Sequence, residues 1–120
     1  MISKEDFVTK DRLVKGIAKD GTLKISVVKT TDVVKAARKK HGLSLLNTVL
    51  LGRALTGTML MASELKGEER IKMRVEGQGP VKLLVAEANR VGEVRGYVQN
   101  PEAEINYDGD TNIGDGIGVG

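Results

Sequence analysis

The stretch from Leu43 to Lys66, LSLLNTVLLGRALTGTMLMASELK, decides the fold of this 120-residue chain. Between Leu45 and Leu65 it carries only two charged residues, Arg53 and Glu64. Apolar side chains fall on nearly every side of a helical wheel, and such a helix is either buried on several sides or spans a membrane. A span needs roughly 20 consecutive apolar residues, but polar residues and glycines interrupt this run. We therefore predict a largely buried central helix over about 43–66, with other layers packed around it.

A hairpin and a shorter helix are predicted before the central helix. Residues 13–18 and 22–28 read as strands, and in the second segment apolar and polar residues alternate, which is the period of a half-buried strand. Asp20-Gly21 between them favours a tight turn. The following helix has credible capping residues at 30–32 and ends at Gly42, which tolerates the left-handed conformation. Ser44 is expected to cap the central helix.

The last turn of the shorter helix is basic, with Arg38, Lys39, Lys40 and His41. One interpretation is a phosphate-binding patch. The favoured interpretation is a solvated helix end, because cations there oppose the negative end of the helix dipole. His41 has no sequence neighbour at metal-binding or catalytic spacing.

Three strands are predicted after the central helix, over 71–76, 81–88 and 93–99, and they form an antiparallel meander. The glycine-rich segment 77–80 resembles a phosphate-binding loop, but no Gly-Lys-Ser/Thr follows and a strand comes next, so we predict a hairpin turn. The whole order of elements predicts an α+β fold in one domain, 1–120, with a mixed or antiparallel sheet packed on the central helix.

Arg53 is an unusual residue for a buried helix, because an isolated buried charge is very unfavourable. We expect a structural ion pair with Glu76 or Glu87 on the following strands. The alternative is that Arg53 binds an anion.

The composition excludes several classes of function. The chain has no cysteine and a single histidine, which rules out disulfides, a thiolate nucleophile and a cysteine-ligated zinc site. No cofactor or metal is therefore expected. The run Asp108-x-Asp110-x-Asn112 resembles the start of a calcium loop, but Ile113 and Val119 stand where the turn glycine and the bidentate glutamate belong. No acid and base are paired at useful spacing, so no enzyme is expected.

The two ends of the chain carry weaker signals. The N-terminal MISKEDFVTKDR lacks the apolar segment of a signal peptide, which favours a cytoplasmic location. The glycine-rich tail over 102–120 is predicted to lack a final structural element, and an unpaired strand edge would favour pairing with another chain.

Several motifs occur in the same order as in a known family. They are Thr30-Thr31-Asp32, Arg38-Lys39-Lys40-His41, Leu51-Gly52-Arg53-Ala54-Leu55, Leu65-Lys66-Gly67-Glu68-Glu69, Gly79-Pro80, Gly92-Glu93-Val94-Arg95-Gly96-Tyr97 and Asn100-Pro101. From about Leu13 onward the chain resembles the N-terminal substrate-binding domain of the heat-shock protein 33 family, the redox-regulated, ATP-independent holdase chaperones of bacteria. The resemblance implies a cytoplasmic α+β core that binds unfolding client proteins and can dimerise.

The chain also departs from that family. Family members continue through a linker to a C-terminal domain in which four cysteines hold zinc or form disulfides, and no cysteine is present here. The expectation is an incomplete chaperone core domain without the redox switch and without zinc.

Two functions are carried forward. The first is a holdase module that captures client proteins on apolar surface. Its candidate client-binding residues are Leu50, Met59 and Met61, since methionine adapts to varied partners. The alternative is that these three residues belong to the core. The second is a basic nucleic-acid or ribosome-associated module using Lys35, Arg38, Lys39 and Lys40, although only three aromatic residues are available for stacking on bases.

Overall fold

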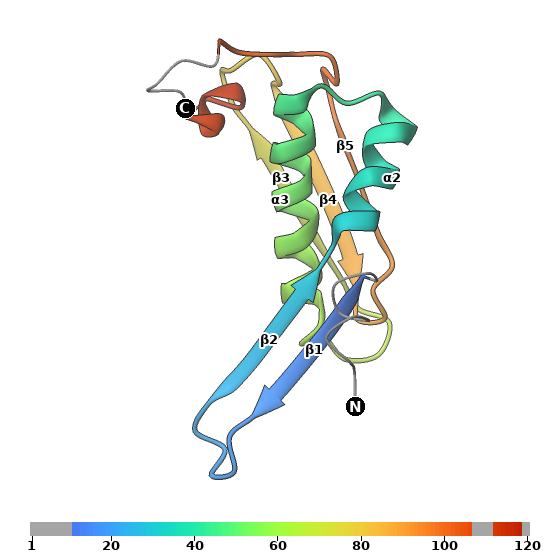
Figure 1. The fold of residues 1–120 in the computed structure, drawn as a ribbon, viewed down its shortest axis with the longest axis vertical. Coiled ribbons are helices and arrows are strands. Elements are labelled where there is room, and N and C mark those ends of the chain that lie inside the picture. Colours follow the sequence, from blue (N-terminus) through green and yellow to red (C-terminus); the bar gives the residue numbers. More distant parts are fainter. Residues whose placement is uncertain (1–10, 107–111, 119–120) are drawn as a thin grey trace.

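The computed structural model describes residues 11–106 and 112–118. The elements follow the chain in the order shown in Figure 1: β1 (Arg12–Ile17), β2 (Lys24–Lys29), α2 (Thr31–His41), α3 (Leu45–Ala62), β3 (Arg70–Glu76), β4 (Leu83–Asn89), β5 (Val94–Val98) and the 3-10 helix η1 (Ile113–Gly116).

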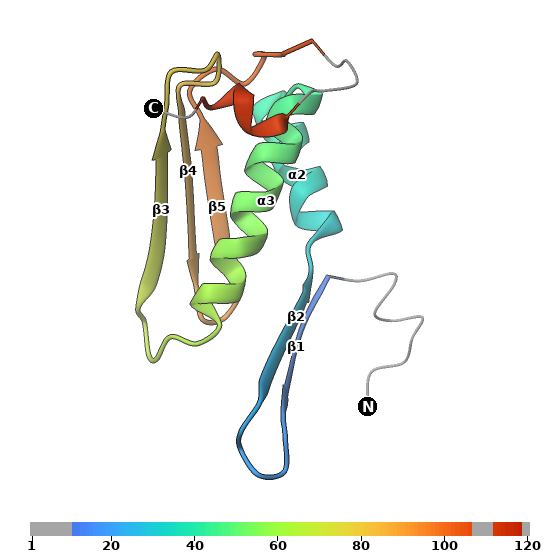
Figure 2. The ribbon, with the colours of Figure 1, turned by 90° about the vertical axis from the view of Figure 1, so that its left-hand side faces the viewer.

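Helix α3 packs one side against a three-stranded antiparallel sheet of order β3-β4-β5. Its fully buried leucines, Leu46, Leu51 and Leu55, lie in one core cluster with Leu84, Ala86 and Val98 of the sheet. Figure 2 shows the three-stranded sheet on one side of α3, with α2 and, at the lower end of the helix, the β1–β2 hairpin on the other side. Among the described residues, α3 is therefore covered by the sheet and also contacts α2, β2 and η1, while its side that carries Arg53 is exposed.

The strand register separates two faces of the sheet. Directly opposed residues share a face, so Met73, Ala86 and Gly96 lie together on the side of α3. A Cβ added to Gly96 would meet Leu51, Leu55 and the Val85 carbonyl oxygen, so this position needs glycine for close packing. The opposite face carries alternating charges, including Lys72, Glu87 and Arg95.

Strands β1 and β2 form their own antiparallel hairpin, which projects from the body of the molecule (Figures 1 and 2). The hairpin is tied to the end of α3 through Lys15, which donates a hydrogen bond to the Ser63 carbonyl and lies 3.7 Å from the Glu64 carboxylate. At the turn, hydrogen bonds from the Thr22 side chain and backbone hold the pKa of Asp20 below its usual value.

The predicted helix boundaries are confirmed in part. Gly42 ends α2 with a left-handed φ of 62°, and the Ser44 side chain accepts a hydrogen bond from the Asn47 N–H at 3.2 Å at the start of α3. The expectation that one of residues 30–32 is the N-cap of α2 is confirmed in position, but the expected side-chain hydrogen bond is absent. Thr30 occupies the cap position without a side-chain hydrogen bond, and Asp11 caps the helix from across the hairpin, accepting from the N–H groups of Asp32 and Val33 at 3.0 and 2.8 Å.

Replacing Asp11 by alanine is expected to lower the free energy of unfolding by about 1 kcal/mol, because two N–H groups in the first turn of α2 lose their acceptor. Urea denaturation followed by circular dichroism measures this change. Asp11→Asn is the comparison, since its one amide oxygen can replace one of the two carboxylate acceptors but cannot pair with Lys29, whose Nζ lies 3.8 Å from the Asp11 carboxylate. The loss should therefore be smaller than in Asp11→Ala, and equal losses in the two variants would show that a single neutral acceptor does not cap α2.

The glycine-rich segment 77–80 forms the predicted turn between β3 and β4, and it also holds the tail of the chain. The N–H groups of Gly79 and Val81 each donate to tail carbonyls, those of Ile117 and Gly116, at 2.9 Å. A Cβ at Gly79 would overlap the tail backbone, so this glycine allows the close approach. The prediction that the tail lacks a final structural element was wrong, because η1 forms and packs on Leu46. Asp108 and Asp110 of the calcium-like run lie outside the described residues.

The α+β prediction is confirmed. Both sheets are antiparallel, and no parallel strand pair occurs within residues 11–106 and 112–118. The central helix is shorter than the predicted 43–66, since α3 begins at Leu45 and ends at Ala62.

Candidate functional site

The β1–β2 hairpin concentrates exposed apolar side chains. On one face Val14 lies opposite Val27, and Ile25 lies opposite Gly16; Ile25 and Val27 are 53% and 45% exposed. The alternating pattern predicted a half-buried strand, but no other described element covers this face. The complete set of large apolar residues exposed on the hairpin is Leu13, Val14, Ile17, Leu23, Ile25 and Val27. Contiguous exposed apolar surface of this kind marks interaction sites.

The open side of α3 forms a second apolar surface. A shallow depression of about 540 Å³ lies there. It is lined by Val34, Thr48, Val49, Gly52, Arg53, Thr56, Gly57 and Leu60. Gly52 allows α2 to approach, since a Cβ at this position would lie 3.2 Å from both methyl groups of Val34.

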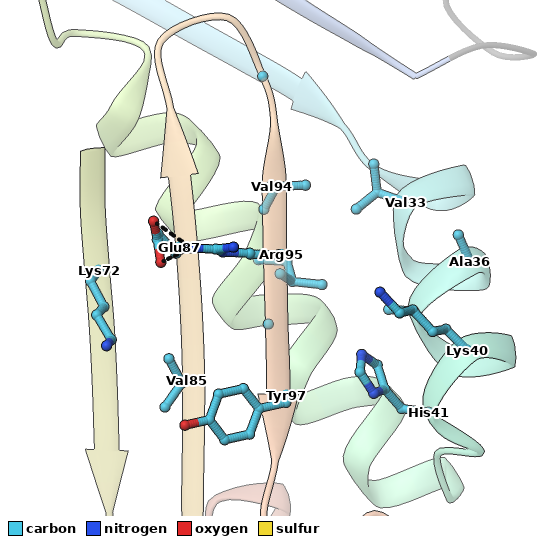
Figure 3. Close-up of a pocket in the computed structure, with 14 residues that line it drawn as sticks. Val33, Ala36, Lys40, His41, Lys72, Val85, Glu87, Val94, Arg95 and Tyr97 are labelled. Atoms are coloured by element: carbon cyan, nitrogen blue, oxygen red, sulfur yellow. Dashed lines mark hydrogen bonds and ion pairs between the residues drawn. The ribbon is translucent and has the colours of Figure 1, made fainter. Parts of the chain in front are cut away.

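A groove of about 700 Å³ separates α2 from β5 and is larger in volume than the depression on α3. Figure 3 shows the Lys40 and His41 side chains extending from α2 toward β5, and Val33 and Ala36 of the same helix also line the groove. The remaining lining includes Val94, Arg95, Gly96 and Tyr97 of β5, and Lys72, Val85 and Glu87 of the neighbouring strands. The groove therefore combines apolar walls, basic side chains and a strand edge.

The three candidate client-binding residues occupy different environments. Leu50 packs against the core cluster, and Met59 is half-buried in a small cavity of about 280 Å³ beside Leu13 and Val28. Met61 is 44% exposed at the end of α3. Of the three, Met61 is the most exposed, and Leu50 and Met59 are half-buried.

The predicted ion pair of Arg53 was wrong for the described residues. Arg53 is exposed on the open side of α3, so it escapes the burial that would have required a partner. Glu76 pairs instead with Arg74 at 2.6 Å, and Glu87 lies between Arg70 and Arg95 at 3.5 and 3.3 Å.

The basic residues of α2 are exposed, as expected for a solvated helix end: Lys35, Arg38, Lys39 and Lys40. Only Lys40 and His41 also line the groove. No cluster of metal-ligating side chains occurs in the part of the chain that the structure describes.

Sequence reasoning missed the groove and the exposed hairpin. The exposed hairpin could have been inferred from the sequence. In β1, Leu13 and Ile17 lie on one face and Val14 on the other, whereas a strand with a single buried face has apolar residues on that face only. No sequence pattern predicts the groove. It depends on the distance in space between α2 and β5, which are more than 50 residues apart along the chain.

By length and composition alone, α3 is apolar enough to cross a membrane. The core helix of a soluble protein passes the same test, and α3 contacts all three strands of the sheet. We therefore assign its apolar character to packing within the fold.

Comparison with known proteins identifies the family. The 33 kDa chaperonin of one Thermus thermophilus strain is 49% identical over 113 residues, which cover 91% of this chain and 33% of that protein. The 33 kDa chaperonin of Bacillus subtilis is 36% identical over 111 residues, which cover 91% of this chain and 38% of that protein. The chain thus spans little more than a third of the length of these relatives.

A solved structure of another 33 kDa chaperonin has a similar fold. The crystal structure of the 33 kDa chaperonin (heat shock protein 33 homolog) from Thermotoga maritima superposes with a TM-score of 0.80 at 38% sequence identity, over 87% of this chain and 37% of that one. The family described as Hsp33 protein matches residues 11–120. The chain therefore belongs to the Hsp33 family of chaperones.

Proposed function

We propose that this chain binds unfolding proteins through exposed apolar side chains, without nucleotide and without making or breaking a bond. Membership of a family named for chaperones supports a chaperone role. The observation that carries the finer proposal is the β1–β2 hairpin, which presents apolar side chains such as Ile25 and Val27 to solvent. The proposed setting is the cytoplasm, and the proposed partners are unfolded clients and, through the same apolar surface, further copies of the chain.

The proposal requires neither ATP nor a redox signal. The segment 77–80 holds the tail through the Gly79 N–H, so this backbone donor is already satisfied and does not cradle a phosphate. Because the 120 residues contain no cysteine, thiol oxidation within them cannot switch client binding on. Binding by these residues is therefore proposed to be independent of oxidant and of zinc.

A second candidate function, nucleic-acid binding, is favoured by the exposed cations of α2. Salt separates the two. Binding to phosphates weakens steeply as salt rises, because it releases counterions, whereas burial of apolar surface does not depend on screening. We expect a fluorescently labelled, denatured client without acidic stretches to bind with nearly the same affinity at low and high salt, as measured by anisotropy. A steep loss at high salt, together with tight binding of a labelled oligonucleotide, would favour the second function.

Replacing Ile25 by serine is expected to weaken binding of the labelled client about fivefold, because a contact that buries this side chain contributes on the order of 1 kcal/mol. The same anisotropy titration measures the effect. Lys24→Ser, a substitution at the neighbouring position on the opposite face of β2, is the matched control and should change the affinity less than about twofold. If both variants bind like the unchanged chain, the hairpin is not the client-binding surface.

A further inference from the structure

The outer edge of β5 is unpaired in the described structure. In an antiparallel pair, alternate residues exchange hydrogen bonds with the partner strand. The Gln99 N–H donates to the Leu83 carbonyl at 2.9 Å, so with the observed register Tyr97 and Arg95 also face β4. The N–H and C=O groups of Val94, Gly96 and Val98 therefore point away from the sheet, and no strand within residues 11–106 and 112–118 pairs with them.

Helix α2 extends the helical layer beyond this edge. Helix α3 contacts β3, β4 and β5, whereas α2 lies chiefly against β5 among these strands. In Figure 1 α2 lies beyond β5, on the side away from β4, and in Figure 2 both helices lie on the same side of the sheet. The apolar residues Val33, Ala36 and Ala37 of α2 line the groove that results. The helices thus extend beyond the last strand of the sheet that the described residues form, far enough to cover one more strand.

The charge of the groove selects the occupant. Lys40, Lys72 and Arg95 line it, with Glu87 as the one carboxylate among its described lining residues, and Glu87 is already shared between Arg95 and Arg70. If a second copy of the chain paired with β5 through its own β5 edge, it would bring the same three cations close to those of the first copy, and the like charges would repel each other. A segment with carboxylates would be attracted.

We propose that the groove between α2 and β5 binds an extended segment of an unfolding protein as a fourth strand, one in which apolar residues alternate with acidic ones. The backbone of the segment pairs with Val94, Gly96 and Val98, its apolar side chains face α2, and its carboxylates lie on the side of Arg95. Strand addition suits a chaperone, because the main-chain hydrogen bonds are independent of client sequence while alternate side chains confer preference. This inference rests on the proposed function, and it assigns client binding to the groove, by addition of a strand to the sheet.

The test uses a short capped peptide in which valine alternates with glutamate, together with two N-methylated forms. One form is methylated at every valine nitrogen and the other at every glutamate nitrogen, so each removes the hydrogen-bond donors of one strand edge and keeps all side chains. Only one edge pairs with β5. We therefore expect one form to lose affinity by at least about tenfold and the other to bind nearly as well as the parent peptide.

Amide hydrogen exchange reports the site directly. Binding of the parent peptide should slow exchange at Val94, Gly96 and Val98 by at least about tenfold. Lys40→Glu should weaken binding about fivefold and Lys39→Glu less than about twofold, because the two substitutions make the same charge change on α2 but only Lys40 lines the groove. A peptide alternating valine with lysine should bind more weakly than the parent.

The outcomes separate this inference from the proposed function. If unfolded clients bind but the three β5 amides stay unprotected by the peptide, or both N-methylated forms bind alike, strand addition is overturned while client binding stands. If the peptide slows exchange at these amides but unfolded clients do not bind, the β5 edge accepts a strand and the proposed chaperone function is wrong. Protection that appears without peptide, together with a dimer in sedimentation, would identify a second copy as the occupant and overturn the inference.

Discussion

Replacing Leu51 by alanine is expected to lower the free energy of unfolding by about 3 kcal/mol. The side chain is fully buried at the centre of α3, where its methyl group lies 3.0 Å from the position that a Cβ on Gly96 would take. Truncation leaves a cavity between helix and sheet, and the backbone of β5 is held by its ladder with β4 and cannot collapse into the space. Urea denaturation at equilibrium measures the loss.

The matched control is Leu45→Ala. Leu45 lies on the same helix but is 51% exposed, so its truncation should cost less than about 1 kcal/mol. If the two variants were equally stable, α3 would not pack on the sheet through Leu51.

Replacing Asn47 by alanine is expected to lower the free energy of unfolding by about 2 kcal/mol, because the hydrogen bonds that its fully buried side chain donates are lost and a cavity is left at the start of α3. The Asn47 side chain is fully buried, and its amide nitrogen, which carries two hydrogens, lies within hydrogen-bond distance of the carbonyls of Asn100 and Pro101, at 2.9 and 3.0 Å, and of the Ser44 hydroxyl, at 3.1 Å. This one side chain therefore fixes the start of α3 against the segment that follows β5. The Asn100-Pro101 motif that contributes to the family resemblance supplies two of the acceptors.

Asn100→Ala provides the comparison, since the Asn100 amide makes a single exposed hydrogen bond, to the Pro80 carbonyl at 2.8 Å. Its loss should cost less than about 1 kcal/mol because water can replace the donor. Thermal or urea unfolding of both variants distinguishes them. Equal, small effects would mean that the backbone N–H groups of Ala103 and Ser44, which already donate to the Asn100 and Pro101 carbonyls, hold this segment without the Asn47 side chain.

The secondary structure could be predicted where the signal is local. Hydrophobic periodicity located the strands, and Gly42 and Ser44 marked helix boundaries through φ preference and side-chain capping. The cap of α2 could not be found in this way, because Asp11 is separated from Asp32 by 21 positions and reaches it only through the hairpin.

The surfaces were harder to predict because they depend on what is left uncovered. Arg53 was expected to need a partner because the central helix was predicted to be largely buried. In the structure this residue is exposed on the open side of α3. The same misjudgement affected Ile25 and Val27, whose alternating pattern predicted a covered face that is open in the described residues.

The candidate client-binding residues illustrate the limit of reasoning by residue type. Methionine was chosen for its adaptability, but Met59 is half-buried in a small cavity while Met61 is exposed. The β5 edge has no sequence signature, since Val94, Gly96 and Val98 would read the same in the middle of a sheet. Whether a strand edge is free depends on tertiary placement alone.

The central claim is that these residues bind unfolding proteins without ATP and without a redox switch. The most direct measurement is light scattering of a client protein during heat unfolding, with the chain added in reducing and in oxidising buffer and with no nucleotide. The account predicts equal suppression of scattering in the two buffers, because the chain has no thiol to oxidise. No suppression in either buffer, or suppression in oxidising buffer alone, would contradict it.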